Sequence, residues 1–187
     1  MQLINDALES DKIIGLFAIS TDAEEPTPDD IYPIGSAAGI AKMLRAPDGT
    51  MRLIVQGLQR IRLLEIVQEE PYYRARIEVI PEIVPAEDIE LEGTVRHVLA
   101  LFERVVNLAP YLPDDLLVFA NSVRNPGHLA DIIASTLNLK LNERQELLEL
   151  NEVGARLRRL TELLNREIEI LEIGSRIQES VKTEMEK

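Results

Sequence analysis

Residues 47–63 read Pro-Asp-Gly-Thr-Met-Arg-Leu-Ile-Val-Gln-Gly-Leu-Gln-Arg-Ile-Arg-Leu, and this stretch decides the fold. Pro47 fixes its φ angle, Asp48 can hydrogen-bond its own backbone, and Gly49 accepts a positive φ, so we expect the chain to reverse direction here. Positions 51 to 56 then alternate as in a strand with one face more buried than the other. The stretch therefore predicts a β-hairpin.

Strand patterns extend to both sides of this hairpin. An apolar run at residues 13–19 has the composition of a strand buried on both faces. Gly57 interrupts the pattern after the turn and predicts a bulge or a sharp bend. Short strands at close spacing favour an antiparallel meander that curls into a small barrel. The strands predicted around the turn cover residues 34–44, 52–56, 60–67 and 72–80.

The hydrophobic period changes to that of helices after Pro85. Asn125 and Pro126 form a cap and first-turn pair, and residues 142–145 resemble a capping box. From Glu152 to Lys187 there is no proline, and the apolar stripe drifts around one long helix. We therefore predict an α+β chain with a β-rich lobe over residues 1–84 and a helical bundle over 85–187, whose last helix, about 152–187, projects beyond the bundle.

The composition narrows the classes of partner. The chain of 187 residues has 20 basic and 33 acidic side chains and a formal net charge of −13, and neither half is basic. This average charge repels a phosphate backbone, so nucleic acid is not an expected partner. There is no cysteine, no positively charged leader and no apolar run of membrane-spanning length. We expect a cytoplasmic protein that does not enter membranes.

Motifs that carry chemistry are missing from the sequence. No G-x-x-x-x-G-K-[ST] phosphate loop occurs, and no serine occupies a strand-to-helix elbow. His97 and His128 fall in different predicted helices without a second ligand at metal-binding spacing. Asp114 and Asp115 are better explained as acids at a helix start than as a catalytic pair. We expect no catalytic residue, no metal site and no cofactor in this chain.

Three arginines near the start of the long helix, Arg156, Arg158 and Arg159, could form an anion-binding patch. Glu152 and Glu162 flank them on the same predicted helix. Pairs of opposite charge three or four residues apart on a helix face one another. We therefore expect ion pairs along this helix.

Several segments together resemble the N-terminal domain of the ATP-dependent Lon proteases. In the β-rich half they are Asp30-Ile31-Tyr32-Pro33-Ile34-Gly35-Ser36-Ala37-Ala38, Pro47-Asp48-Gly49-Thr50 and Val55-Gln56-Gly57-Leu58-Gln59-Arg60. In the helical half they are Pro113-Asp114-Asp115-Leu116, Leu129-Ala130-Asp131, Leu139-Lys140-Leu141 and Glu167-Ile168-Glu169-Ile170-Leu171. Their order and spacing match, and the resemblance covers essentially the whole chain.

The resemblance implies a PUA-like β-barrel lobe joined to a helical bundle whose last helix leads toward an ATPase module. In that family the domain captures unfolded or damaged proteins and supports the hexamer. ATP, Mg and the Ser-Lys dyad of the serine endopeptidase belong to other modules, so this chain is expected to be no enzyme. Family members also begin with a strand of Leu-Pro-Leu-Arg type, whereas this sequence starts inside the following helix. We therefore expect an incomplete β-rich lobe.

Met43 and Leu44 are the candidate substrate-binding residues, because they precede the turn and methionine adapts to varied side chains. The alternative is that both residues belong to the core. The long helix is expected to mediate self-association. A second functional hypothesis is a stand-alone adaptor that binds proteins without protease activity, and RNA binding by the β-rich lobe is disfavoured by charge.

Overall fold

The structure is a computed structural model that describes residues 2–22, 24–85 and 88–185. It divides into two compact units, Met1–Pro81 and Glu82–Lys187, which are described separately below. Ile83 belongs to the second unit, because its amide donates to the carbonyl of Asn151 at 2.9 Å and its own carbonyl accepts from the amide of Val153 at 3.0 Å. In the part of the chain that the structure describes, no helix is both long and apolar enough to cross a bilayer.

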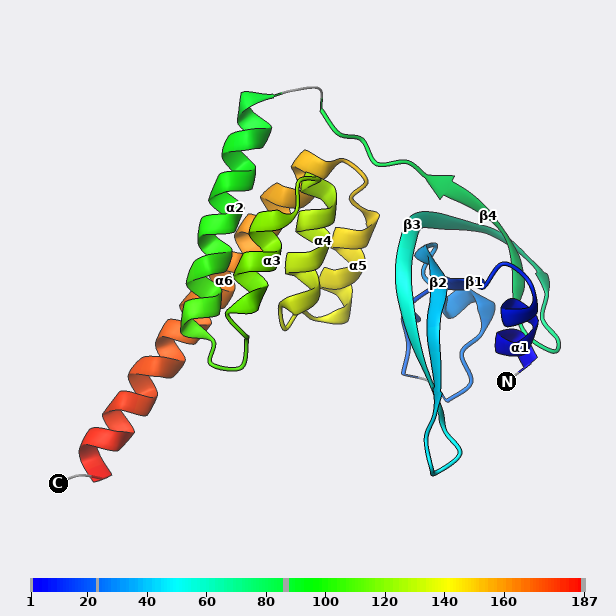
Figure 1. Cartoon of the computed structure of the whole chain (residues 1–187), viewed down its shortest axis with the longest axis horizontal. Helices are drawn as coiled ribbons and strands as arrows, with labels where there is room; N and C mark the ends of the chain where they lie inside the picture. Colours follow the sequence, from blue (N-terminus) through cyan, green and yellow to red (C-terminus); the bar gives the residue numbers. More distant parts are fainter. Residues whose placement is uncertain (1, 23, 86–87, 186–187) are drawn as a thin grey trace. The chain divides into compact units, whose positions relative to one another are not determined.

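The first unit is an antiparallel sheet with a helix at its start (Figure 1). The strands follow one another in the order β1-β2-β3-β4, as the predicted meander requires. Local turn signals therefore correctly predicted the topology. The elements are α1 (Gln2–Glu9), β1 (Ile13–Leu16), the short 3-10 helix η1 (Pro28–Asp30), β2 (Ile34–Arg45), β3 (Met51–Gln68) and β4 (Arg74–Ile80).

β3 is one strand of 18 residues, and the prediction of two separate strands at 52–56 and 60–67 was wrong. The bend predicted at Gly57 is present as a break in register. Ala37 pairs with Gln59, whereas the next residue, Ala38, pairs with Gly57, so Leu58 is an extra residue on β3. A bulge bends and twists a strand without ending it, which explains how the pattern broke while the strand continued.

β1 is an edge strand, so the expectation that it is buried on both faces was wrong. Among the described strands it pairs only with β2, and Ile13 and Leu16 remain exposed. Its contact with β2 is nevertheless close at one point. A Cβ atom added at Gly35 would overlap the carbonyl oxygen of Leu16 and the ring of Phe17. Glycine at this position therefore allows the chain after β1 to lie directly on β2.

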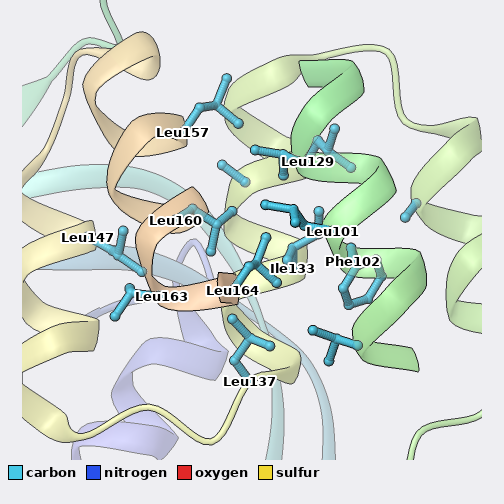
Figure 2. Close-up of a cluster of buried hydrophobic side chains, with 14 of the residues drawn as sticks. Leu101, Phe102, Leu129, Ile133, Leu137, Leu147, Leu157, Leu160, Leu163 and Leu164 are labelled. Atoms are coloured by element: carbon cyan, nitrogen blue, oxygen red, sulfur yellow. The ribbon is translucent and has the colours of Figure 1, made fainter. Parts of the chain in front are cut away.

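The second unit is the helical bundle, and the α+β class predicted from the sequence is confirmed. Its core lies between α2, α4 and α6, as the cluster in Figure 2 shows. Phe102 of α2 and Leu164 of α6 are both fully buried there. The helices are α2 (Ile89–Leu108), α3 (Asp115–Ser122), α4 (Pro126–Thr136), α5 (Leu141–Glu149) and α6 (Val153–Met185).

The start of α4 agrees with the prediction, and the start of α5 does not. The side chain of Asn125 caps α4, accepting a hydrogen bond from the amide of His128 at 2.8 Å. α5 begins at Leu141, earlier than the capping box predicted at residue 142. The carboxylate of Glu143 reaches back to the amide of Lys140 at 3.0 Å and also pairs with Arg166. The hydrogen bond from Arg166, followed by that from the Lys140 amide, lowers the pKa of Glu143 to about 2.

The long helix α6 has two parts with different surroundings. Its first turns supply core residues from Val153 to Ile168. Beyond them, an apolar stripe stays exposed at positions that share one face of the helix, namely Ile170, Ile173, Ile177 and Val181. The terminal half of α6 therefore presents an exposed apolar stripe, while Glu172 beside it forms an ion pair with Arg104 of α2.

Candidate functional site

Met43 and Leu44 lie at the outer end of β2, close to the turn. Their side chains are 40% and 43% exposed, so neither belongs to the core. Met43 stands opposite Leu53 of β3, and Leu44 stands opposite Arg52. Because successive side chains of a strand point to opposite faces, the two candidates lie on different faces of the hairpin. The two candidate residues, which the sequence suggested as one site, therefore belong to two separate surfaces of the hairpin.

The outer part of the β2–β3 hairpin, residues 41–55, forms a two-stranded ribbon that we call the ribbon arm (Figure 1). β1 pairs with β2 only over Ser36–Gly39, and β4 pairs with β3 only from Arg60 onward. Among the described residues no third strand therefore covers the arm, and each of its strands has one open backbone edge. Such an edge can hydrogen-bond an added strand.

The tip of the ribbon arm is a closed turn that fixes the register of its two strands. The amide of Gly49 donates to the carbonyl of Ala46 at 3.0 Å, and Gly49 has a φ of 83°. The carboxylate of Asp48 accepts from the amide of Thr50 at 2.9 Å and from its hydroxyl at 2.6 Å. These bonds, the hydroxyl's first, lower the pKa of Asp48. The turn holds Met43 and Leu44 opposite their partners on β3.

Exposed apolar side chains are not confined to the ribbon arm. They continue along β3 and onto β4, so that much of the sheet surface is apolar. These residues are distributed over both faces of the strands, and exposed apolar surface of this kind is typical of interaction sites on folded proteins. The exposed large apolar residues of these strands are Met43, Leu44, Ile54, Val55, Leu58, Leu64, Val67, Ile77 and Val79.

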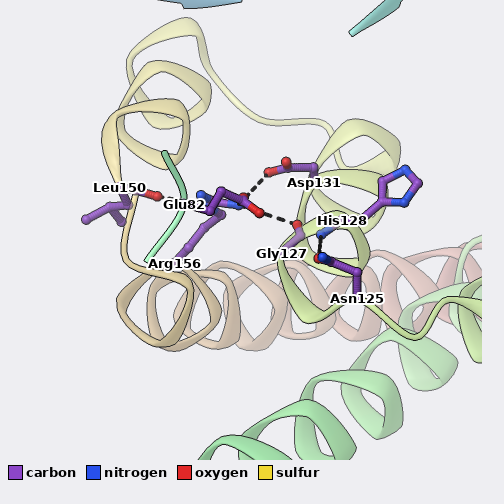
Figure 3. Close-up of polar contacts among 7 residues, drawn as sticks. All are labelled: Glu82, Asn125, Gly127, His128, Asp131, Leu150 and Arg156. Atoms are coloured by element: carbon purple, nitrogen blue, oxygen red, sulfur yellow. Dashed lines mark hydrogen bonds and ion pairs between the residues drawn. The ribbon is translucent and has the colours of Figure 1, made fainter. Parts of the chain in front are cut away.

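Arg156 is the centre of a polar cluster in the helical unit that sequence reasoning missed (Figure 3). Its side chain is 1% exposed, and its Nη1 donates to Glu82 Oε1 at 2.6 Å and to Asp131 Oδ1 at 3.3 Å. Its Nε donates to the carbonyl of Leu150 at 2.9 Å. The cluster joins the segment before α2 to α4, the end of α5 and α6. The contacts of Arg156 therefore link four segments of the bundle.

The other two arginines of the predicted ion pairs behave as expected. Arg158 pairs with Glu152 at 3.7 Å, and Arg159 pairs with Glu162 at 2.7 Å. Both pairs lie on the surface of α6 or just before it. The difference from Arg156 arises because Arg156 points into the bundle, where its partners come from distant segments. No anion-binding patch is formed by the three residues together.

The remaining candidate residues, two histidines and two aspartates, do not come together in one site. His97 and His128 are both exposed on different helices, α2 and α4. Asp114 precedes α3 and Asp115 begins it, without a side-chain cap. Within residues 2–22, 24–85 and 88–185, no group of three histidine, aspartate or glutamate side chains is arranged to hold a metal ion.

The chain is similar to proteins of a known family. The family model of the ATP-dependent protease La (LON) substrate-binding domain matches residues 1–166. The chain belongs to the LON substrate-binding domain family. The family resemblance seen in the sequence is thereby confirmed, and the apolar sheet of this LON domain lies within the matched residues.

Curated relatives of this LON domain are whole Lon proteases. The Lon protease of Dictyoglomus thermophilum is 49% identical over 187 residues, which is all of this chain and 24% of the relative. The Lon protease of Syntrophus aciditrophicus is 37% identical over 191 residues, again all of this chain and 24% of the relative. The chain thus spans about a quarter of the length of the curated relatives it matches.

Solved structures show the same fold. The N-terminal domain of Mycobacterium avium complex Lon protease matches with a TM-score of 0.67 at 19% identity, covering 87% of this chain and 82% of that chain. The Lon N-terminal domain protein from Xanthomonas campestris matches with a TM-score of 0.59 at 16% identity, covering 85% and 80%. These similarities support the fold of the LON domain.

Proposed function

We propose that this chain is the substrate-recognition domain of an ATP-dependent Lon protease and captures unfolded or damaged proteins for degradation. The observation that carries the proposal is the exposed apolar surface of the sheet and its ribbon arm, in a chain of the LON substrate-binding family. The serine endopeptidase activity, with its ATP and Mg, would belong to the remaining length of such a protease, since the relatives are much longer chains.

The ribbon arm suits unfolded chains for two physical reasons. An unfolded segment exposes apolar side chains that a native protein buries. Contact between those side chains and Met43, Leu44 or Ile54 removes apolar surface from water and lowers the free energy. The unfolded segment also carries unpaired backbone groups, which can hydrogen-bond the open edges of the arm as an added strand. A native protein buries most of its apolar side chains and pairs most of its backbone groups, so the arm would favour the unfolded state of a polypeptide.

Replacing Met43 and Leu44 together by glutamate is expected to weaken binding of a permanently unfolded model protein by about tenfold, because two apolar contacts are lost and charges are buried. Each single variant tests one face of the arm. Fluorescence anisotropy of the labelled unfolded protein measures the affinity, and circular dichroism confirms that the variants fold.

The matched control replaces Val118 and Phe119, an adjacent pair of exposed apolar residues on α3. Val118→Glu with Phe119→Glu should leave the affinity unchanged if the ribbon arm is the binding surface. Equal affinity of the wild type and the Met43→Glu, Leu44→Glu variant, with both folded, would remove these residues from the site.

The alternative function is a stand-alone adaptor without protease activity. It is the weaker proposal, because the curated relatives that match the whole chain are proteases of much greater length. The two proposals share the same recognition surface and differ in what the chain is joined to. Unfolded substrate should be degraded with ATP when this chain is part of the longer protein, and left intact under the adaptor hypothesis.

We further propose that the terminal half of α6 mediates self-association, in support of a hexamer in the full-length protein. Its exposed stripe of Ile170, Ile173, Ile177 and Val181 has the spacing of a helix face that packs on another helix. Ile173→Lys with Ile177→Lys should shift the chain to a smaller species in sedimentation velocity. Deleting all of α6 would be no test, because its first turns belong to the core.

Exposed polar positions on the same turns of α6 supply the control for this experiment. Ser175→Lys with Gln178→Lys adds the same charge away from the stripe and should leave the sedimentation coefficient of the wild type unchanged. If wild type and both variants sediment identically at high concentration, the stripe does not associate with a second copy.

A further inference from the structure

The ribbon arm has the opposite charge to the rest of the protein. Residues 41–55 contain three basic side chains, Lys42, Arg45 and Arg52, and one acid, Asp48, which gives a net charge of +2. The whole chain carries −13. An exposed apolar surface with this local charge is matched by a ligand that is apolar and negatively charged.

The three cations of the arm have no acidic partner among the described residues. Elsewhere on the sheet, Arg62 pairs with Glu78 at 3.0 Å and Arg76 with Glu65 at 3.1 Å. No ion pair or side-chain hydrogen bond is found in the described part of the chain for Lys42, Arg45 or Arg52, and all three are exposed. The acid that lies nearest in sequence, Asp48, is bound by Thr50 within the turn. The cations are therefore free to meet a ligand.

The positions of these cations on β2 define a pattern. Along the open edge of β2 the side chains run Lys42, Met43, Leu44, Arg45, so two apolar residues lie between two cations. A strand added at this edge would place one residue opposite each of them. Opposite charges across strands stabilise a pair and like charges destabilise it. The complementary segment thus reads acidic, apolar, apolar, acidic, in either strand direction.

We propose that the ribbon arm selects extended segments in which two apolar residues lie between two acidic ones, binding them as a strand along residues 41–45 of β2. This inference rests on the proposed function and names the class of substrate that the same surface prefers. Apolar contacts supply the binding, and Lys42 and Arg45 set the charge pattern. Arg52, opposite Leu44 on β3, lies one strand further from the bound strand and adds a third positive charge to the arm.

The test compares labelled peptides that share one apolar centre and differ in charge pattern. The first contains Glu-Val-Leu-Glu, the second Lys-Val-Leu-Lys, and the third Glu-Glu-Val-Leu, which keeps the composition but changes the order. Anisotropy titrations with the whole chain should give the first peptide about tenfold higher affinity than the second, with the third between them. The difference between the first two should shrink as salt is added, because exposed charges are screened.

Two triple variants of equal charge locate the effect. Lys42→Gln, Arg45→Gln and Arg52→Gln should remove the preference for the acidic peptide. Arg74→Gln, Arg124→Gln and Lys182→Gln lower the net charge equally at exposed positions outside the arm and should keep the preference. A preference that survives the first triple variant, or disappears in the second, would overturn the assignment to the arm.

The outcomes separate this inference from the proposed function. Equal affinity for the Glu and Lys peptides overturns the charge preference and leaves substrate recognition in place. Failure of every apolar peptide and of the unfolded model protein to bind overturns recognition itself. A single-stranded oligonucleotide is the competing ligand. If it binds more tightly than the acidic peptide, and if this binding is lost in the arm variant only, the cations bind nucleic acid and the proposal is overturned.

Discussion

Phe102→Ala is expected to lower the free energy of unfolding of the helical unit by about 3–5 kcal/mol. Phe102 is fully buried on α2, within the core that α4 and α6 complete (Figure 2). Removing the ring leaves a cavity in addition to the lost transfer free energy, because the surrounding helices can relax only in part. Denaturant unfolding followed by circular dichroism measures the loss.

Phe119 supplies the matched control for this variant. It is also a phenylalanine on a helix of the second unit, but its side chain is 52% exposed. Phe119→Ala should cost less than about 1 kcal/mol, since little apolar surface returns to water. Hydrogen exchange should show that Phe102→Ala loosens residues 89–168 while amides of β2 and β3 keep their protection. Equal losses in both units would mean that the chain unfolds as one body.

Arg156→Ala is expected to destabilise the helical unit by about 3 kcal/mol. The substitution removes the charge that Glu82 and Asp131 share and leaves the carbonyl of Leu150 without its hydrogen bond. The loss lies at the low end of the range for buried ion pairs, because both carboxylates remain partly in contact with water. Thermal and denaturant unfolding at neutral pH measure this change.

Arg158, two residues after Arg156 on α6, is the control for Arg156. It is exposed and lies 3.7 Å from Glu152, so Arg158→Ala should cost less than about 1 kcal/mol. Arg156→Met keeps most of the buried stem and separates the loss of charge from the loss of packing. If Arg156→Ala and Arg158→Ala lose the same stability, the polar cluster does not hold the bundle together.

Several features that depend on neighbouring residues were predicted from the sequence, although the start of α5 and the continuity of β3 were not. The turn at Pro47, the bulge at Gly57 and the cap at Asn125 are local arrangements, and all three are present. Arg156 was misjudged because its partners Glu82 and Asp131 lie 74 and 25 residues away along the chain. Helical spacing gives no information about contacts of that range.

The exposure of the candidate site also depends on residues that are distant in the sequence. Alternation along β2 already implied that Met43 and Leu44 lie on opposite faces. Their exposure could not be predicted, because it depends on where β1 and β4 stop pairing with the hairpin. The burial of β1 was mispredicted for the same reason. Its apolar composition indicated a strand buried on both faces, but its place at the edge of the sheet depends on which strands pair with it.

The open edges of the ribbon arm would be an aggregation hazard on an uncharged strand, since identical edges can join sheets of separate molecules. Lys42, Arg45 and Arg52 make two arms repel each other when they approach edge to edge. The cations therefore act as gatekeepers. Because of them, the protein can keep an apolar strand edge accessible in solution without forming fibrils through it.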